Sequence, residues 1–558
     1  MIDKDRASEE PAEAGRVWRW LPRVGGLLFL VLALHAARLE TPTVDEFAHV
    51  PAGMAHLVHG RLDLYSKNPP LFKALMAAPV LARFRVVVPE VDVPSLGWGP
   101  WLYGQRFMQA NRGRYLDLFL PARMVAILAG LLAGVVIHTW SRELFGTRAA
   151  AVGTTLYFLS PTVLAHAHLA TTDVGGMAGV VLVMFVLRRA CSRPGLARVL
   201  LAALAWGAAL LVKFTAVLLL PVVVVVAGAC RWGDPRRAVR DLLLIAVGAL
   251  LVVNLGMGFQ GSLRTLGSYH LDSGFGGAVQ RVLPGWTPVP LPREYVVGFD
   301  AQKRDTESGE FASYLNGRWS EGGWWYYDLV ALAVKTPLPF LPLLLAAAWR
   351  LRSCRLPRRE LVLLLAPPAV FLVAMTGFNR LNIGIRYLLP LFPFLFIMLG
   401  ALWKRWSGRW SQVAAALAVT WYAVAAVATA PAHLSFFNLA VGGPRNGHRI
   451  LLDSNLDWGQ DLYRLRPALD RLGYDGSVGL LYFGHVEPAL YGIDYELIPA
   501  GPVEGVLAVS INYLMGAGYV VTAPDDSLRV VPAGHLDWLR EREPIARAGS
   551  IWIFDTRR

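Results

Sequence analysis

The sequence is poor in charge, in cysteine and in repeats. Only 17% of its 558 residues are charged, which is well below the share expected of a soluble protein. No internal repeat or low-complexity segment is visible, which argues against a repeat architecture. The three cysteines, Cys191, Cys230 and Cys354, lack CxxC spacing and lie in or beside basic connectors. We therefore expect free thiols in a reducing cytoplasm and no disulfide framework.

Apolar residues make up 55% of the chain, and many apolar stretches are long enough to cross a bilayer as helices. The net charge of +14 comes from short clusters beside these stretches, so it indicates topology signals and not a nucleic-acid-binding surface. The apolar run at 24–37 follows Arg16, Arg19 and Arg23 and lacks a small-residue cleavage site, which predicts an uncleaved first helix.

Hydropathy and length predict eleven membrane spans, starting from a cytoplasmic N-terminus. They lie near 18–38, 117–140, 149–166, 173–188, 198–213, 214–230, 241–258, 326–349, 360–376, 385–402 and 411–430. The apolar stretch at 197–230 is too long for one span, so we divide it at Lys213. This topology places five basic connectors inside: those with Arg142 and Arg148, Arg188 to Arg198, Arg231 to Arg240, Arg350 to Arg359, and Lys404 to Arg409.

The predicted fold is an all-α polytopic membrane protein with a small C-terminal α/β domain. Residues 1–430 form the membrane domain, with long outer loops at 39–116 and 259–325. Residues 431–558 form the extracytoplasmic domain, because strand-like runs alternate there with a helical run near 460–472. The strand-like runs are RILLDS, VGLLYFG, GVLAVS and SIWIFD.

The first outer loop opens with an acidic pair, Asp45 and Glu46, followed by apolar residues at helical spacing. These apolar residues are Phe47, Val50, Met54 and Leu57. The pattern predicts an amphipathic helix in the membrane interface, with Asp45 and His49 on one face. The acidic pair also fits a solvated helix start in which Thr43 or Asp45 is the cap.

Three further ionisable residues map to the same membrane face as the first-loop acids: Asp173, Lys213 and Arg386. Each alone also fits an interface anchor or a snorkelling side chain. Ionisable residues at membrane depth are costly and usually functional, so their common location indicates a site. A carboxylate can take the proton of an acceptor, while Lys and Arg stabilise the charge that develops on a phosphate. The set suits the transfer of a sugar from a phosphate ester.

The sequence resembles the GT-C glycosyltransferases of family 39, which include protein O-mannosyltransferases and the transferases that add aminoarabinose to lipid A. The motifs that carry the resemblance are DEFAH at 45–49, NPPLFKAL at 68–75, LATTD at 169–173, YLNGRWSEGGWWYYDLVALAVKTPLP at 314–339 and IRYLLPLFP at 385–393. The tail segment LLDSNLDWGQDLYRL resembles a block in bacterial members whose acceptor is unassigned.

The resemblance implies a sugar donor linked to dolichyl or undecaprenyl phosphate, inversion at the anomeric carbon, and Asp45 as the catalytic base. We add Glu46 and Asp173 as catalytic candidates. The candidates for substrate binding are His49, Asn68, Lys213, Arg386 and Tyr387. The expected partners are the lipid-linked donor, membrane lipids, and an acceptor that is a protein, a lipid or a glycan.

No cofactor is assigned. The aminoarabinose branch carries an acid and then a lysine before PPL, where this chain has Lys67 and Asn68, so a zinc site built on that acid is unsupported. A divalent metal on histidines is a second possibility, with candidates His49, His56, His59, His166 and His168. The alternative interpretation is hydrogen-bonding or interfacial histidines.

The expected location is the inner membrane, with the site and the tail on the extracytoplasmic side. Two other functions fit parts of the sequence. A lipid or sugar transporter would also carry intramembrane charges, but no pseudo-repeat accompanies them. A scaffold that recruits a partner through its tail would not need eleven spans.

Overall fold

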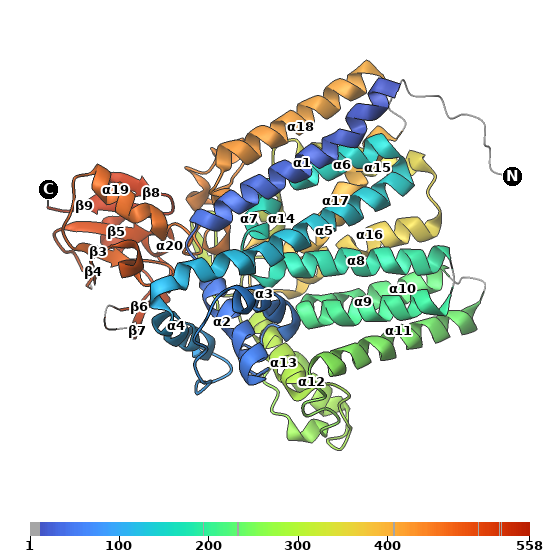
Figure 1. Ribbon diagram of the computed structural model, residues 1–558, viewed down its shortest axis with the longest axis horizontal. Coiled ribbons are helices and arrows are strands. Elements are labelled where there is room, and N and C mark those ends of the chain that lie inside the picture. Colours follow the sequence, from blue (N-terminus) through green and yellow to red (C-terminus); the bar gives the residue numbers. More distant parts are fainter. Residues whose placement is uncertain are drawn as a thin grey trace.

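The computed structural model describes residues 12–193, 195–230, 234–404, 408–499, 501–523, 525 and 527–557. Parts of three predicted basic connectors, at 194, 231–233 and 405–407, lie outside these described residues. Long apolar helices lie side by side, and a compact sheet region is at one end of them (Figure 1).

The helices up to residue 429 are α1 (Ala12–Leu39), α2 (Val44–His59), α3 (Pro70–Arg83), α4 (Gly99–Ala110), α5 (Phe119–Phe145), α6 (Thr147–Phe158), α7 (Pro161–Ala167), α8 (Thr172–Ser192), α9 (Leu196–Val212), α10 (Leu219–Cys230), α11 (Pro235–Gly256), α12 (Gly274–Val282), α13 (Arg293–Ser308), α14 (Tyr327–Lys335), α15 (Phe340–Leu351), α16 (Arg358–Phe378), α17 (Phe392–Leu399) and α18 (Arg409–Thr429). The 3-10 helices that matter for the site are η2 (Phe214–Leu218), η5 (Ile385–Leu391) and η10 (Asp453–Asn455). A short hairpin joins β1 (Ser313–Leu315) to β2 (Arg318–Ser320).

All of the predicted spans coincide with helical structure, but they are not all uniform helices. Within the described residues, seven helices are long and apolar enough to cross a membrane, and an eighth span results if α14 and α15 count as one. The last two helices form a pair bent by 106° at a break that contains Pro337 and Pro339. Helices α9 and α10 are apolar but shorter. The count of eleven therefore remains a prediction.

The division at Lys213 is confirmed. Helix α9 ends at Val212, and Lys213 adopts an extended conformation with φ −155° and ψ 135° before the chain continues as η2 and α10. The predicted span at 149–166 is also divided, because Pro161 begins α7 after the end of α6. Both breaks bring polar groups to helix ends within the apolar bundle.

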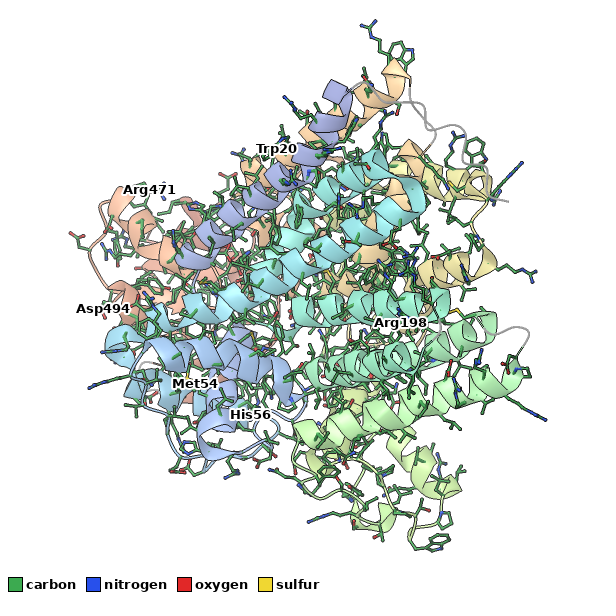
Figure 2. All side chains as sticks on the ribbon, turned by 45° about the vertical axis from the view of Figure 1, so that its right-hand side comes forward. Trp20, Met54, His56, Arg198, Arg471 and Asp494 are labelled. Carbon is green, nitrogen blue, oxygen red and sulfur yellow. A yellow bond between two sulfur atoms is a disulfide. The ribbon has the colours of Figure 1, made fainter. Side chains whose placement is uncertain are left out.

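The two ends of the bundle differ in what they carry (Figure 2). Arg198, in a predicted inner connector, lies toward one end. Met54 and His56 of the first outer loop lie toward the other end, as do Arg471 and Asp494 of the C-terminal region. This arrangement agrees with a topology in which the first loop and the tail share one side of the membrane.

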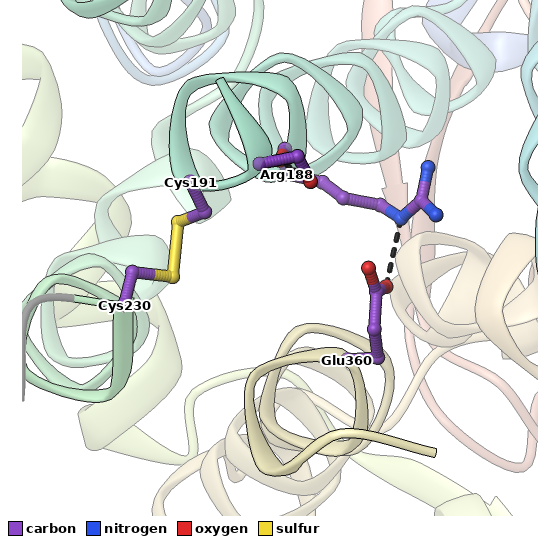
Figure 3. Close-up of a disulfide and its surroundings, with 5 residues drawn as sticks. Arg188, Cys191, Cys230 and Glu360 are labelled. Carbon is purple, nitrogen blue, oxygen red and sulfur yellow. Dashed lines mark hydrogen bonds and ion pairs between the residues drawn. A yellow bond between two sulfur atoms is a disulfide. The ribbon is translucent and has the colours of Figure 1, made fainter. Parts of the chain in front are cut away.

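The prediction of three free thiols is wrong for two of them. Cys191 at the end of α8 and Cys230 at the end of α10 form a disulfide, with their Cα atoms 5.4 Å apart (Figure 3). Cys354 is free and buried. The spacing rule looks for near neighbours in sequence, whereas these cysteines meet because α8 and α10 both end on the same side of the bundle. The cysteines therefore do not support a cytoplasmic location for the end of the bundle at which α8 and α10 terminate.

Some of the basic residues at that end have structural partners. Arg188 on α8 donates to Glu360 on α16 at 2.7 Å (Figure 3). It also pairs with Glu143 on α5. This buried arginine joins three helices, so its charge is more than a topology signal.

The C-terminal region contains a mixed five-stranded sheet in the order β4-β3-β5-β9-β8. The helices and strands of the whole region are α19 (Leu465–Arg471), β3 (Val478–Leu481), β4 (Tyr495–Leu497), β5 (Val506–Ser510), α20 (Ile511–Leu514), β6 (Tyr519–Thr522), β7 (Leu528–Val531), β8 (Ala546–Ala548) and β9 (Ile551–Asp555). Strands β4, β3 and β5 are parallel, and β9 and β8 extend the sheet in antiparallel fashion. The prediction of a small α/β unit is confirmed, whereas its boundary at 431 stays a prediction.

The predicted strand RILLDS is wrong. Residues 453–455 form η10, and Asp453 has φ +55°, which no β-strand allows. Ser454 and Asn455 bond to residues 383 and 385 of the membrane part, and the Asp453 N–H bonds to Asn512 of α20, not to a neighbouring strand.

Candidate functional site

Four charged side chains from distant parts of the sequence form a row of alternating sign. Asp45, in the first turn of α2, accepts a hydrogen bond from Arg386 of η5 at 2.6 Å. Arg386 Nη1 also lies 3.9 Å from Asp173 Oδ2, in the first turn of α8. The other oxygen of Asp173 accepts a hydrogen bond from Lys213. We call Asp45, Arg386, Asp173 and Lys213 the charged quartet.

Local structure explains how these residues meet. Both acids occupy first turns of helices, where the helix dipole favours a negative charge. The extended backbone of Lys213 interrupts the bundle and lets its side chain run along α8. Gly176 makes that approach possible, since a Cβ there would lie 3.0 Å from Lys213 Cδ.

The four side chains differ in their exposed fraction, and therefore in how easily a ligand can reach them. The exposed fractions of the side chains are 3% for Asp173, 9% for Arg386, 13% for Lys213 and 16% for Asp45. Charges so far out of water require opposite partners, and the row supplies them with no net charge. Asp45 is the most accessible of the four, and only its Oδ2 is bonded to Arg386. It is therefore the acid of the quartet that solvent reaches most easily.

Three of the predicted binding residues lie beside the quartet: Tyr387, Asn68 and, one turn after Asp45 on α2, His49. The ring of Tyr387 lies 5.7 Å from Lys213 Nζ and 5.4 Å from Arg386 Cζ, so it faces both cations. Asn68 accepts a hydrogen bond of 3.1 Å from the hydroxyl of Thr172, the neighbour of Asp173.

His49 lies one turn after Asp45 and stacks on Tyr65 at a ring distance of 4.9 Å. Burial lowers the pKa of His49 to about 4, against the influence of Asp45, so the ring is neutral at neutral pH. The helix predicted here is confirmed as α2, but most of it is buried against neighbouring elements, so it does not present the free apolar face that was expected. Of its apolar residues Phe47, Val50, Met54 and Leu57, only Leu57 is exposed.

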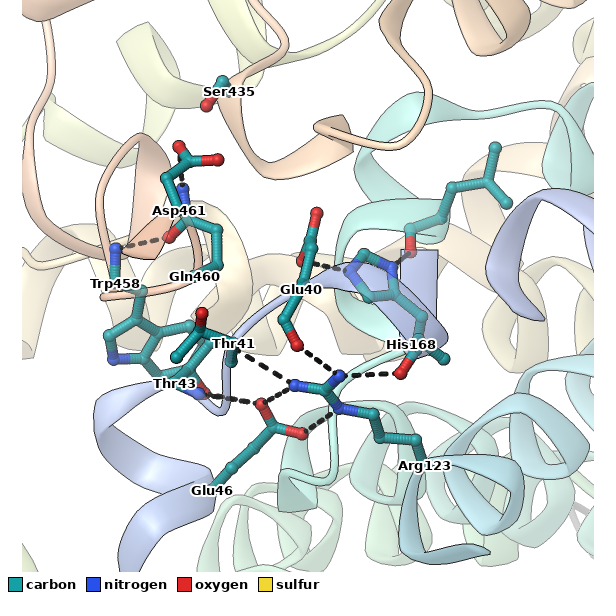
Figure 4. A network of polar contacts seen from close by, with 12 residues as sticks. Glu40, Thr41, Thr43, Glu46, Arg123, His168, Ser435, Trp458, Gln460 and Asp461 are labelled. Atoms are coloured by element: carbon teal, nitrogen blue, oxygen red, sulfur yellow. Dashed lines mark hydrogen bonds and ion pairs between the residues drawn. The ribbon is translucent and has the colours of Figure 1, made fainter. Parts of the chain in front are cut away.

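Glu46 lies elsewhere. Its carboxylate is fully buried and accepts two hydrogen bonds of 2.7 Å from Arg123 (Figure 4). It accepts a third, also of 2.7 Å, from the Ala170 N–H. It also caps α2 by accepting from the Thr43 N–H at 2.9 Å. Burial alone would raise the pKa of Glu46, but Arg123 and these N–H groups hold it below its ordinary value. Since its oxygens are all occupied, we assign Glu46 a structural role.

The five histidines do not gather. Among the described residues, no group of three His, Cys, Asp or Glu side chains is arranged to hold a metal ion. His168 is held by Glu40 at 2.8 Å and by the Leu164 carbonyl at 2.7 Å (Figure 4). His56 and His59 bond to the carbonyls of Arg61 and Val88. His166 is buried.

The sequence analysis missed two tail residues beside the quartet. The buried ring of Trp458 lies 4.3 Å from Arg386 Cζ. Burial raises the pKa of Asp453 to about 6, and Arg386 acts against that rise. Both residues belong to the segment LLDSNLDWGQDLYRL, which carried part of the resemblance but received no role. The resemblance of that segment was therefore the sequence signal that could have identified both residues.

Known proteins of similar sequence or structure agree with the resemblance seen in the sequence. Residues 116–255, about a quarter of the chain, match the family model of dolichyl-phosphate-mannose-protein mannosyltransferases. ArnT from Cupriavidus metallidurans in the apo state has a similar structure, with a TM-score of 0.50 and 15% identity over 97% of this chain and 98% of that chain. No curated protein sequence matches the chain.

Two more solved structures are similar at lower scores. ArnT from the same organism bound to undecaprenyl phosphate gives a TM-score of 0.49, with 15% identity over 95% of this chain and 97% of that chain. The oligosaccharyltransferase AglB from Archaeoglobus fulgidus, in complex with an inhibitory peptide and a dolichol-phosphate, gives 0.44, with 13% identity over 92% of this chain and 75% of that chain.

The chain has the GT-C fold. It is a multi-pass membrane protein, and its predicted resemblance to family 39 is confirmed by the match at 116–255. Within this GT-C fold, the matched segment contains Asp173 and Lys213, whereas Asp45 and Arg386 lie on either side of it.

Proposed function

We propose that the protein is a membrane glycosyltransferase that moves a sugar from a polyprenyl-phosphate carrier to an extracytoplasmic acceptor. The observation that carries this proposal is the charged quartet, which combines two cations for a phosphate with an accessible carboxylate. The GT-C fold and the family match at 116–255 support the same reaction class.

In this proposal Lys213 and Arg386 bind the carrier phosphate, because ammonium and guanidinium groups stabilise the charge of a departing phosphate. Asp173 contacts both cations, one with each carboxylate oxygen, and so fixes their positions relative to each other. Tyr387, beside both cations, and Asn68, beside Thr172, complete the walls around the phosphate.

Asp45 acts as the general base. An acceptor oxygen forms a bond to the anomeric carbon from the face opposite the phosphate, and the bond from that carbon to the phosphate oxygen breaks. The phosphate leaves with the electron pair, and the acceptor proton goes to Asp45. A single displacement of this kind inverts the anomeric carbon.

The site and the C-terminal domain face the outside of the inner membrane in this proposal. The basic connectors support this orientation, and Arg198 from one of them lies toward the opposite end of the bundle (Figure 2). Reporter fusions at Gly442 and at Arg236 should give opposite compartments, and the same compartment for both would reject the orientation.

The decisive experiment uses purified protein in detergent with undecaprenyl phosphate that carries a radiolabelled hexose or pentose. Release of undecaprenyl phosphate without any ion gradient supports a transferase. Movement of the intact lipid across a vesicle bilayer without release supports the transporter alternative. Mass spectrometry of envelope glycoconjugates, with and without the protein, then identifies the acceptor that loses its sugar.

A further inference from the structure

The C-terminal domain reaches into the membrane part through the segment 453–461. The hydroxyl of Ser454 donates to the Ile383 carbonyl at 2.6 Å, and the Ile385 N–H donates to Asn455 Oδ1 at 2.9 Å. Gly384 lies between these two bonds, and a Cβ on it would collide with the Ser454 hydroxyl. The segment therefore fixes the backbone that leads into Arg386.

The same segment holds the Arg386 side chain. The guanidinium carbon lies 4.3 Å from the centre of the Trp458 ring, which is 2% exposed. Arginine over a tryptophan face is attracted by the ring quadrupole, more strongly when water is excluded. The guanidinium is thus held against a ring of the tail while its Nη1 bonds to Asp45.

Trp458 also fixes the other partner of the ion pair. Its carbonyl accepts a hydrogen bond of 3.0 Å from the N–H of Val44, the residue before Asp45. The Thr41 N–H bonds in the same way to the Gln460 carbonyl at 3.0 Å. One segment of the tail therefore contacts both sequence regions that supply the Asp45 and Arg386 pair.

The sheet domain makes this segment rigid. Asn512 of α20 accepts from the Asp453 N–H at 3.0 Å and donates to the Asp457 carbonyl at 2.9 Å. The Asp461 carboxylate accepts from the Ser550 N–H at 2.9 Å, just before β9. On the membrane side, Lys335 of α14 donates to the Asn455 carbonyl at 2.6 Å.

We propose that the C-terminal domain is a positioning element of the site, in which Asn455 and Trp458 hold Arg386 and the start of α2 in the geometry that receives the carrier phosphate. This inference rests on the proposed function, since it takes Arg386 as a phosphate ligand. It differs from a purely structural role of the tail, which would affect folding and not affinity for the phosphate.

The test measures affinity for undecaprenyl phosphate, together with the thermal unfolding midpoint, for Trp458→Leu. Loss of the aromatic face should weaken binding by about three- to thirtyfold. Trp458→Phe keeps an aromatic face and should restore most of the affinity. Trp458→Met carries the same prediction as the leucine variant if the latter does not fold.

A matched control lies in the same domain. Arg547 of β8 lies 3.8 Å from the centre of the Trp552 ring of β9, a comparable contact that is distant from the quartet in sequence and in contacts. Trp552→Leu should leave affinity for undecaprenyl phosphate unchanged.

Three results would count against the inference. If folded Trp458→Leu binds undecaprenyl phosphate as tightly as the unmodified protein, the segment does not position Arg386. If Trp552→Leu weakens binding equally, the effect comes from domain stability. If the unmodified protein does not bind undecaprenyl phosphate at all, the proposed function fails and this inference fails with it.

Discussion

Arg386 donates a hydrogen bond of 2.6 Å to Asp45, although 341 positions separate them in sequence. The proposed base and a proposed phosphate ligand are thus partners before any substrate binds. A phosphate that bonds to Arg386 competes with Asp45 for the same guanidinium. Binding of the carrier would therefore free the carboxylate that the acceptor needs.

We expect Lys213→Ala and Arg386→Ala to weaken binding of undecaprenyl phosphate. Loss of one charged hydrogen bond costs about 1.5–3 kcal/mol, so affinity should fall by about tenfold to a hundredfold. The measurement is a titration of purified protein with undecaprenyl phosphate. Lys303→Ala is the control, because Lys303 pairs with Glu307 on α13 and does not contact the quartet. Normal affinity in both site variants would move the phosphate site elsewhere.

Glu46→Gln should destabilise the protein and leave the chemistry of folded molecules largely intact. Removal of one charge from a buried pair leaves Arg123 uncompensated, which costs about 3–5 kcal/mol. Thermal unfolding in detergent measures the loss. Asp63→Asn is the control, since its pair with Arg61 is partly exposed and is worth less than about 1 kcal/mol. A stable Glu46→Gln protein without turnover would return Glu46 to the catalytic set.

Much of the membrane part was predictable because apolar length and basic connectors act locally. The break at Lys213 followed from the length of a single apolar stretch, and the helix from Val44 followed from periodicity. Asp45, Asp173, Lys213 and Arg386 were found because charge is rare in such a sequence, and the structure brings them together.

The sequence was less able to predict which role each of these residues has. Asp45 and Glu46 are adjacent acids, and only the position of Arg123 on α5 separates the accessible carboxylate from the structural one. The pairing of Cys191 with Cys230 depends on how α8 and α10 end. The segment at 453–455 has apolar, strand-like neighbours, but its hydrogen bonds go to residues 383 and 385, to Lys335 and to Asn512, and not to a neighbouring strand.

The disulfide predicts a specific pattern of alkylation. Protein denatured without reductant should take up one alkyl group, at Cys354, and reduced protein should take up three. Mass spectrometry of the peptides identifies the sites. Cys191→Ser should expose the thiol of Cys230 to labelling without reductant. Uptake of three groups without reductant would show that the bridge does not form in the cell.

The neutral state of His49 predicts a dependence of stability on pH. Its folded pKa of about 4 lies below the ordinary value of 6.5, so the unfolded chain binds the proton first as pH falls. Stability should decline between about pH 6.5 and pH 4, with His49 contributing about 3 kcal/mol. His49→Phe keeps the stacking on Tyr65 and should reduce this decline by the share of His49. Substitution of the exposed His270 by Gln should not change it.

Asp45→Asn gives the sharpest test of the chemistry. The amide preserves shape but cannot take the acceptor proton, so turnover should fall by about a hundredfold to ten-thousandfold. Affinity for undecaprenyl phosphate should stay equal or increase, because the amide competes less strongly than the carboxylate for Arg386. Release of undecaprenyl phosphate and a binding titration measure the two effects on the same preparation. Near-normal turnover in Asp45→Asn, together with its loss in Asp173→Asn, would place the base at Asp173. Weaker binding in Asp45→Asn would show instead that Asp45 holds Arg386 in place for the phosphate and does not compete with it.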